Sequence, residues 1–242
     1  MPVLDRVTLA GRRLSGNAVG EMPKQQATAL DPQREHWERT FASRPGMFGG
    51  EPSYAAQKSA AVFRAEGRLR LLELGGGQGR DSLFFAREGF DVTVLDYSHA
   101  GLSEIQAKAE AAGVSGRVRT LVHDARTPLP FAAARFDAVY SHMLFCMALT
   151  STELMALSAE VWRVLVPGGL NIFTVRTKQD AHYGVGTHHG EDMYEVGGFI
   201  VHFFDRAKVE AVSKGFSIVS VEEFEEGRLP RKLFLVTARK PK

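Results

Sequence analysis

Short apolar runs alternate with longer amphipathic segments along most of this chain. Runs typical of buried strands occupy residues 71–74, 91–96, 117–125, 136–142 and 170–173. Helical spacing fills the intervals between them, and Thr150 with Glu153 has the spacing of a capping box at the start of one such helix. This alternation predicts an α/β domain with a doubly wound parallel sheet and helices on both of its faces.

The C-terminal part departs from this rhythm. A helix near residues 205–214 precedes two strand-like segments, 216–226 and 232–239, which are separated by only a few residues around Gly227 and Pro230. A connection this short cannot form a parallel crossover. We therefore expect one of these two strands to run antiparallel to the sheet.

The N-terminal part divides into a tail and a helical segment. Residues 1–30 lack sustained periodicity, and we expect a flexible tail there. Asp31-Pro32 is a typical helix start, and the segment 31–66 predicts two helices that could act as a lid over a site. With 242 residues, the chain suits a single domain over residues 31–242.

The most informative stretch follows the first strand, where glycines stand at positions 75, 76, 77 and 79. Such a turn between a strand and a helix forms the floor of nucleotide or nucleoside sites. A dinucleotide fingerprint requires glycine at the sixth place, but that place is Arg80. Glu73 would also repel a pyrophosphate, whereas it suits a cationic or hydroxyl-bearing ligand.

Further residues follow at matching distances. Asp96 ends the second strand about 20 residues after the first glycine, where such folds place an acceptor for ribose hydroxyls. The third strand ends in His-Asp-Ala at residues 123–125, and Pro167-Gly168-Gly169 predicts a turn between a long helix and the fifth strand. In this order, over residues 71–176, the motifs resemble those of the class I S-adenosylmethionine-dependent methyltransferases.

The resemblance implies a Rossmann-like sheet of seven strands, mostly parallel, with an antiparallel C-terminal strand. It also implies S-adenosylmethionine as the cofactor, with Tyr97 against the adenine face and Asp124 and Ala125 reading the adenine edge. The cofactor-binding residues that it implies are Glu73, Gly75, Gly76, Gly77, Gly79, Asp96, Tyr97, Asp124, Ala125 and Ser141.

The segment 177–199 is a substrate-side insertion, because it leaves the edge of the sheet where doubly wound folds place their sites. Three interpretations stay open: a pocket in which His182, Tyr183 or His189 orients or deprotonates the acceptor, a metal site, or a polar surface loop. The metal site would use His182, His188, His189 and Asp192, but their spacing matches no standard ligand pattern. Our substrate candidates are Trp37, Asp180, His188 and His189.

The candidate catalytic residues are His142, His182 and Tyr183. His142 ends the fourth strand, next to the expected methyl position, and is either a general base or a structural histidine. The Asn/Asp-Pro-Pro-Tyr motif of amino-group methyltransferases of nucleic acids is absent there, and Ser141-His142-Met143-Leu144 takes its place. An amino group of a nucleic acid is therefore a less favoured acceptor.

Composition narrows the partners. The formal net charge is only +2, and the basic residues near the C-terminus follow an acidic run, so a nucleic-acid partner is not favoured. We expect no membrane span, a cytoplasmic protein that is a monomer or a homodimer, and a small-molecule acceptor, as in the thiopurine and tellurite-resistance methyltransferases that it weakly resembles. The alternatives are a methyltransferase acting on RNA or protein, an NAD-dependent oxidoreductase and a nucleoside-binding relative without transferase activity.

Overall fold

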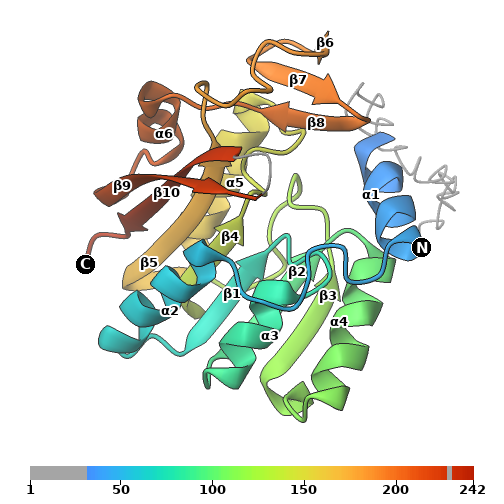
Figure 1. The fold of residues 1–242 in the computed structure, drawn as a ribbon. Coiled ribbons are helices and arrows are strands. Elements are labelled where there is room, and N and C mark those ends of the chain that lie inside the picture. The colour runs from blue at the N-terminus through green and yellow to red at the C-terminus, as the bar shows by residue number, and fades with distance from the viewer. Residues whose placement is uncertain (1–31, 228–230) are drawn as a thin grey trace, which may run out of the picture.

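The computed structural model describes residues 32–227 and 231–242 (Figure 1). The expected N-terminal tail, the cap at Asp31 and residues 228–230 lie outside the described residues. Within the described ranges, none of the helices combines the length and the apolar character that crossing a membrane requires.

A seven-stranded sheet forms the centre of the fold, in the order β3-β2-β1-β4-β5-β10-β9. β10 pairs antiparallel with both of its neighbours, whereas β1 to β5 run parallel, which confirms the sheet and the C-terminal hairpin expected from the sequence. The strand bounds are β1 Arg70–Leu74, β2 Asp91–Asp96, β3 Val118–Val122, β4 Phe136–His142, β5 Leu165–Arg176, β9 Ser217–Glu226 and β10 Arg231–Arg239.

Helices cover both faces of this sheet (Figure 1). Side chains of β5 alternate between the two resulting cores, with Ile172 packing on one side and Phe173 on the other. One core is shared with α2 (Tyr54–Ala65), α3 (Arg80–Arg87) and α4 (His99–Ala111), and the other with α5 (Ser151–Val164) and α6 (Arg206–Val212). A 3-10 turn, Ser115–Arg117, follows α4, and α1 (Pro32–Ser43) lies against α4 and the insertion.

Short polar side chains begin these helices by accepting hydrogen bonds from otherwise unpaired backbone N–H groups. Ser98 accepts from the N–H of Gly101 at the start of α4, which leaves Asp96 free of the capping role. The capping box of Thr150 and Glu153 is present at the start of α5, as its spacing predicted.

Pro167-Gly168-Gly169, which we expected to form a turn before the fifth strand, lie inside that strand. α5 ends at Val164, and β5 already begins at Leu165, which pairs with Phe136. Regular pairing resumes only at Leu170, so the residues between them form an irregularity inside the strand, where Gly168 has a φ of 76°. Positive φ is the reason for a glycine at this point.

The insertion contains a small sheet, so the interpretation of residues 177–199 as a polar surface loop is wrong. β6 (Thr187–His188), β7 (Met193–Val196) and β8 (Phe199–His202) form a three-stranded antiparallel sheet above the end of β5 (Figure 1). Gly197 and Gly198, with φ of 60° and 85°, form the two-residue turn between β7 and β8. Two such glycines between apolar residues are a hairpin signal that the sequence analysis missed.

Candidate active site

The glycine-rich turn joins β1 to α3 where the sheet leaves no room for side chains. A Cβ on Gly76 would lie 2.2 Å from Cγ1 of Val94, and a Cβ on Gly79 would lie 2.7 Å from Cγ1 of Ile105. Gly77 has a φ of 53°, which few residues with a side chain adopt. The turn is therefore a bare backbone surface, although Gly79 itself packs on α4 and does not face the cavity described below.

A glycine in α4, which the sequence analysis missed, allows α4 to pack closely against the glycine-rich turn. A Cβ on Gly101 would lie only 2.4 Å from the carbonyl oxygen of Gly77. Its signal in the sequence was a glycine in the first turn of a helix, where alanine would form the helix better. The first turn of α4 thus lies directly against the glycine-rich turn.

Asp96 connects these elements through its carboxylate. Oδ2 accepts a hydrogen bond of 2.8 Å from the N–H of Gly77, and Oδ1 accepts one of 2.9 Å from the N–H of Ser98. Burial nevertheless raises the pKa of Asp96 to about 6. Each oxygen retains a lone pair for a further donor.

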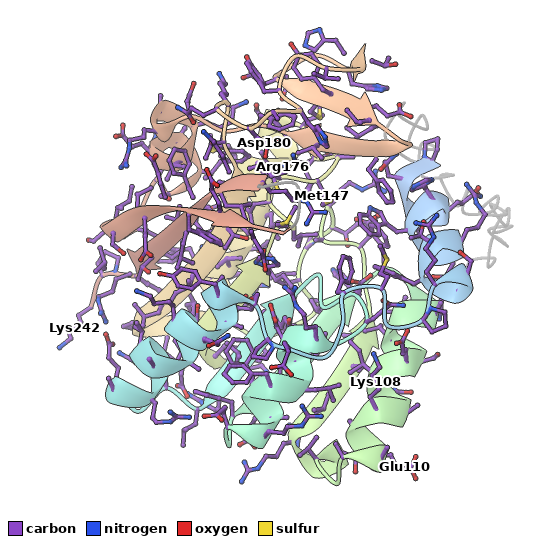
Figure 2. All side chains as sticks on the ribbon, viewed as in Figure 1. Lys108, Glu110, Met147, Arg176, Asp180 and Lys242 are labelled. Atoms are coloured by element: carbon purple, nitrogen blue, oxygen red, sulfur yellow. The ribbon has the colours of Figure 1, made fainter. Side chains whose placement is uncertain are left out.

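A cavity of about 310 Å³ begins at this turn and extends under the insertion sheet. The side chains of Met147 and Arg176 lie beneath that sheet, near the end of β5 (Figure 2). Of the candidates taken from the sequence, the residues that line the cavity are Trp37, Glu73, Gly75, Gly76, Gly77, Asp96, Tyr97, Ala125, His142 and His182.

Glu73 is the most unusual of these residues. It is buried, and its Oε2 has no hydrogen-bond partner. Burial, reinforced by the negative charge of Asp81, raises the pKa of Glu73 to about 8. A buried polar atom without a partner in a cavity wall fits a ligand with a cationic or hydroxyl group, such as the amino acid part of S-adenosylmethionine.

Besides Gly79, two further cofactor candidates do not line the cavity. Arg126 donates to both carboxylate oxygens of Asp124, at 3.1 and 2.7 Å, although the neighbouring His123 and Ala125 are in the wall. Ser141 is fully buried with an unpartnered Oγ, outside the wall. An adenine contact by Asp124 would require its carboxylate to share its hydrogen bonds with Arg126.

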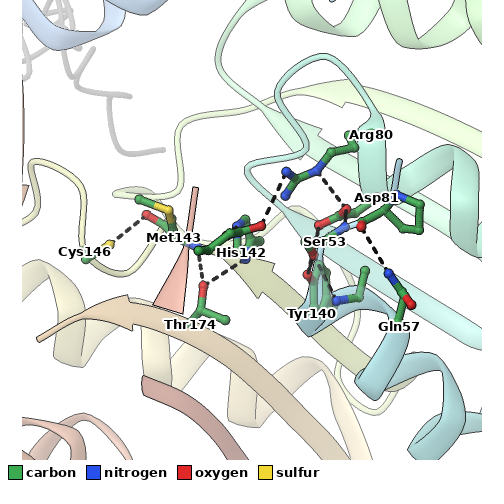
Figure 3. A network of polar contacts seen from close by, with 12 residues as sticks. Ser53, Gln57, Arg80, Asp81, Tyr140, His142, Met143, Cys146 and Thr174 are labelled. Carbon is green, nitrogen blue, oxygen red and sulfur yellow. Dashed lines mark hydrogen bonds and ion pairs between the residues drawn. The ribbon is translucent and has the colours of Figure 1, made fainter. Parts of the chain in front are cut away.

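His142 is held from two sides (Figure 3). Its Nδ1 lies 3.1 Å from Oγ1 of Thr174, and its Nε2 lies 3.0 Å from Oε2 of Glu226. A carboxylate only accepts hydrogen bonds, so Nε2 donates to Glu226, while Nδ1 is hydrogen-bonded to the hydroxyl of Thr174. Neither nitrogen is free to take a proton from a ligand.

Glu226 belongs to a wider network that the sequence analysis did not identify. Burial alone would raise the pKa of Glu226, but its hydrogen bond from His142 and the positive charge of Arg80 outweigh that effect and lower it. Arg80 also donates to Asp81, 3.1 Å away, whose carboxylate further accepts from the hydroxyls of Ser53 and Tyr140 (Figure 3). Strands and helices far apart in the sequence bring these groups together, so no local motif marks them.

His182 lies in the wall, whereas Asp180 supports it from behind. Asp180 is buried and forms an ion pair with Arg176, with Nε 3.1 Å from Oδ2. The same carboxylate accepts hydrogen bonds of 2.9 Å from the backbone N–H groups of His182 and Lys232. Asp180 therefore holds the insertion to β10 and does not contact the cavity.

The remaining insertion candidates also lie outside the cavity wall. Tyr183 donates to Asp192 at 2.9 Å, a hydrogen bond that raises the pKa of its hydroxyl. His188 is exposed and stacks on Tyr194, and His189 lies 2.8 Å from Oε2 of Glu195. Within residues 32–227 and 231–242, no group of three or more His, Cys, Asp or Glu side chains has an arrangement that could hold a metal ion.

Aromatic side chains from α1 and the insertion close the wall opposite the sheet. The ring centroid of Trp37 lies 4.7 Å from that of Phe199 and 5.2 Å from that of Phe41. Met47 and Phe48 from the following loop line the same cavity. Residues of the segment 32–66 thus form part of the cavity wall.

Comparisons with known proteins agree with this geometry. Residues 71–169 match the family model described as a methyltransferase domain. No curated protein matches the sequence. The structure of a 1,6-didemethyltoxoflavin-N1-methyltransferase from Burkholderia thailandensis is similar, with a TM-score of 0.67 at 18% identity over 90% of this chain and 93% of that chain.

Two further solved structures share the fold. Magnesium protoporphyrin IX methyltransferase from Synechocystis PCC 6803 has a TM-score of 0.66 at 15% identity, over 90% of this chain and 100% of that chain. TehB from Haemophilus influenzae has a TM-score of 0.61 at 19% identity, over 84% of this chain and 67% of that chain. Residues 71–169 therefore form a methyltransferase domain, on a fold that this chain shares with solved methyltransferases. Two of those structures hold S-adenosylmethionine or S-adenosylhomocysteine, which supports S-adenosylmethionine as the cofactor.

Proposed function

We propose that this enzyme transfers a methyl group from S-adenosylmethionine to an oxygen, sulfur or nitrogen atom of a small molecule. The observation that carries the proposal is the shape of the cavity. It has a volume of about 310 Å³ and extends from the glycine-rich turn to the insertion sheet. α1 bounds it on one side and β7 and β8 on another. A covered space of this volume suits a small acceptor better than RNA or a protein chain.

The cavity residues divide into two groups around the expected transfer point. Asp96 would accept hydrogen bonds from ribose hydroxyls, Glu73 would face the amino acid part, and Tyr97 would lie against adenine. The cofactor supplies a methyl group on a sulfonium, which the acceptor removes by in-line displacement. The insertion residues then hold the acceptor in line and exclude water, which is the main contribution that such a reaction asks of the protein.

His142 contributes position rather than proton transfer in this arrangement. Both of its ring nitrogens have protein partners, Thr174 and Glu226, so it would have to release one of them before acting as a base. The lowered pKa of Glu226 also makes that carboxylate a weak base. The geometry therefore favours an acceptor that arrives ionised or with an available lone pair.

The similar structures support a small acceptor. The toxoflavin methyltransferase structure contains 1,6-didemethyltoxoflavin and S-adenosylhomocysteine, and the enzyme from Synechocystis is named for magnesium protoporphyrin IX. Both names refer to small molecules with conjugated rings. The aromatic rings of Trp37 and Phe199 in the present cavity suit an acceptor of that general kind.

Isothermal titration with S-adenosylmethionine tests the part of the proposal that concerns cofactor binding. Asp96→Ala should weaken binding by roughly 1 to 3 kcal/mol, because ribose hydroxyls lose their acceptor. Asp91→Ala is the matched control, since Asp91 lies at the other end of β2 in an ion pair with Arg117. Equal affinities of the two variants would contradict the assignment of Asp96.

The part of the proposal that concerns the methyl acceptor requires a methyl-transfer assay. We expect S-adenosylhomocysteine to form with at least one member of a panel of phenols, thiols and amines. Product formed only with RNA or protein would contradict the small-molecule proposal.

A further inference from the structure

Arg231 is a cation in the wall of the cavity that has no side-chain partner among the described residues. It begins β10, is exposed, and makes no side-chain hydrogen bond or ion pair with any residue in the described ranges. Its neighbour across the β9–β10 pair is Glu226, whose carboxylate is already engaged by His142 at 3.0 Å and Arg80 at 3.6 Å. Among residues 32–227 and 231–242, no carboxylate is therefore paired with the positive charge of Arg231.

Arg176, at the end of β5, adds a second guanidinium to the same wall. It is buried, and its Nε and Nη2 are used by Asp180, while Nη1 has no hydrogen-bond partner among the described residues. Its guanidinium carbon lies 5.3 Å from the ring centroid of Phe203, which fixes the plane of the group. One edge of a pre-oriented guanidinium thus remains available to a ligand.

His182 contributes a further donor. Nη2 of Arg176 lies 3.2 Å from Nδ1 of His182. Arginine can only donate, so Nδ1 accepts and the proton of the neutral ring lies on Nε2. Because His182 lines the cavity, that N–H group adds to the two guanidinium groups at this end.

The rest of this end of the cavity is apolar and aromatic. β7 and β8 contribute Tyr194, Phe199 and Val201, Phe203 follows β8 directly, and α1 contributes Trp37. Flat aromatic molecules pack well against such rings. An apolar wall also strengthens the attraction between a guanidinium and an anion, because it limits the access of water.

We propose that the methyl acceptor is a small aromatic molecule with an anionic group, a carboxylate or a phosphate, that Arg231 binds together with Arg176 and His182. This inference rests on the proposed function and names the class of its acceptor. The aromatic body lies against the rings of β8 and α1, and the anionic group lies at the ends of β5 and β10.

The test compares matched probes by isothermal titration with and without S-adenosylhomocysteine. The probes are 4-hydroxybenzoate, phenyl phosphate and methyl 4-hydroxybenzoate, which is the neutral ester of the first. A charge-assisted hydrogen bond corresponds to about tenfold in affinity or more, so at least one anion should bind about tenfold more tightly than the ester. The carboxylate and phosphate probes show which anion the site takes.

Arg231→Gln should weaken binding of the preferred anion about tenfold and leave the ester unchanged. Lys232→Gln is the matched control, because it removes the neighbouring positive charge of β10 outside the cavity wall. Arg231→Lys should restore part of the loss. Thermal melting of each variant confirms that it is folded.

Two results would overturn the inference: equal binding of the anions and the ester, or anion binding that Arg231→Gln leaves unchanged. Failure of the wild-type protein to bind S-adenosylhomocysteine would instead count against the proposed function. The titrations without S-adenosylhomocysteine still decide the anion question in that case, so the two failures are distinguishable.

Discussion

The glycine-rich side of the cavity and the insertion above it use carboxylates in opposite ways. On the cofactor side, burial raises the pKa of Glu73 to about 8 and of Asp96 to about 6, and Oε2 of Glu73 has no partner. In the insertion, burial is outweighed by Lys178 and Lys208, which hold the pKa of Asp192 at about 2. The cofactor side thus has unmet capacity for a ligand, whereas acids of the insertion hold the protein together.

The largest effect expected from this difference is on stability, at Asp180. Asp180→Ala should lower the free energy of unfolding by about 3 to 5 kcal/mol, because it leaves the buried guanidinium of Arg176 uncompensated. The backbone N–H groups of His182 and Lys232 would lose their acceptor as well. Urea denaturation measures the change.

His188→Ala is the control within the same insertion. His188 is exposed, so its removal should change the free energy of unfolding by less than about 0.5 kcal/mol. A stable Asp180→Ala protein with weakened acceptor binding would contradict the structural role and restore Asp180 as a substrate contact.

The second effect concerns Glu73 in the ligand-free protein. A carboxyl group whose folded pKa exceeds its unfolded value of 4.5 binds more protons in the folded state. Stability is therefore lost as the pH rises from about 4.5 to about 8. Glu73→Gln removes this loss, so the variant should exceed the wild type by about 3 kcal/mol at pH 7 and by little at pH 4.

Thermal or urea unfolding at several pH values checks this prediction. The same substitution should weaken binding of S-adenosylmethionine, because the ligand loses an ionisable partner. A stability difference that does not change with pH would show that Glu73 has an ordinary pKa, and the contrast with the insertion would disappear.

Most residues that the sequence analysis assigned to cofactor binding line the cavity, because their positions follow from local patterns. Glu73, the glycines and Asp96 lie within two consecutive strand–turn–helix units, and their positions at strand ends follow from the pattern alone. The mostly parallel central sheet and its antiparallel C-terminal strand were likewise anticipated, from that rhythm and from one short connection, whereas the order of the strands was not.

The sequence analysis did not predict the residues at the insertion end of the cavity, because tertiary contacts bring them together. Arg176 and Asp180 are close in sequence, but nothing in the sequence shows that they bury each other behind His182. Glu226 and Arg231 reach the cavity only because β10 inserts between β5 and β9. Gly197-Gly198 is the exception, because these residues are a local signal for the β7–β8 hairpin that the sequence analysis did not use.

Gly101→Ala has a smaller expected effect on stability than the changes at Asp180 and Glu73, and it tests whether the glycine-rich turn is a preformed backbone surface. Gly101→Ala places a Cβ 2.4 Å from the carbonyl oxygen of Gly77, so α4 and the turn must separate. Overpacking of this kind costs roughly 1 to 3 kcal/mol, partly offset by about 1 kcal/mol from the better helix propensity of alanine. The affinity for S-adenosylmethionine is therefore the clearer measurement, and it should fall about tenfold or more. Gly116→Ala, where a Cβ meets nothing within 4 Å, should leave the affinity unchanged; equal affinities would show that the turn adjusts to its ligand.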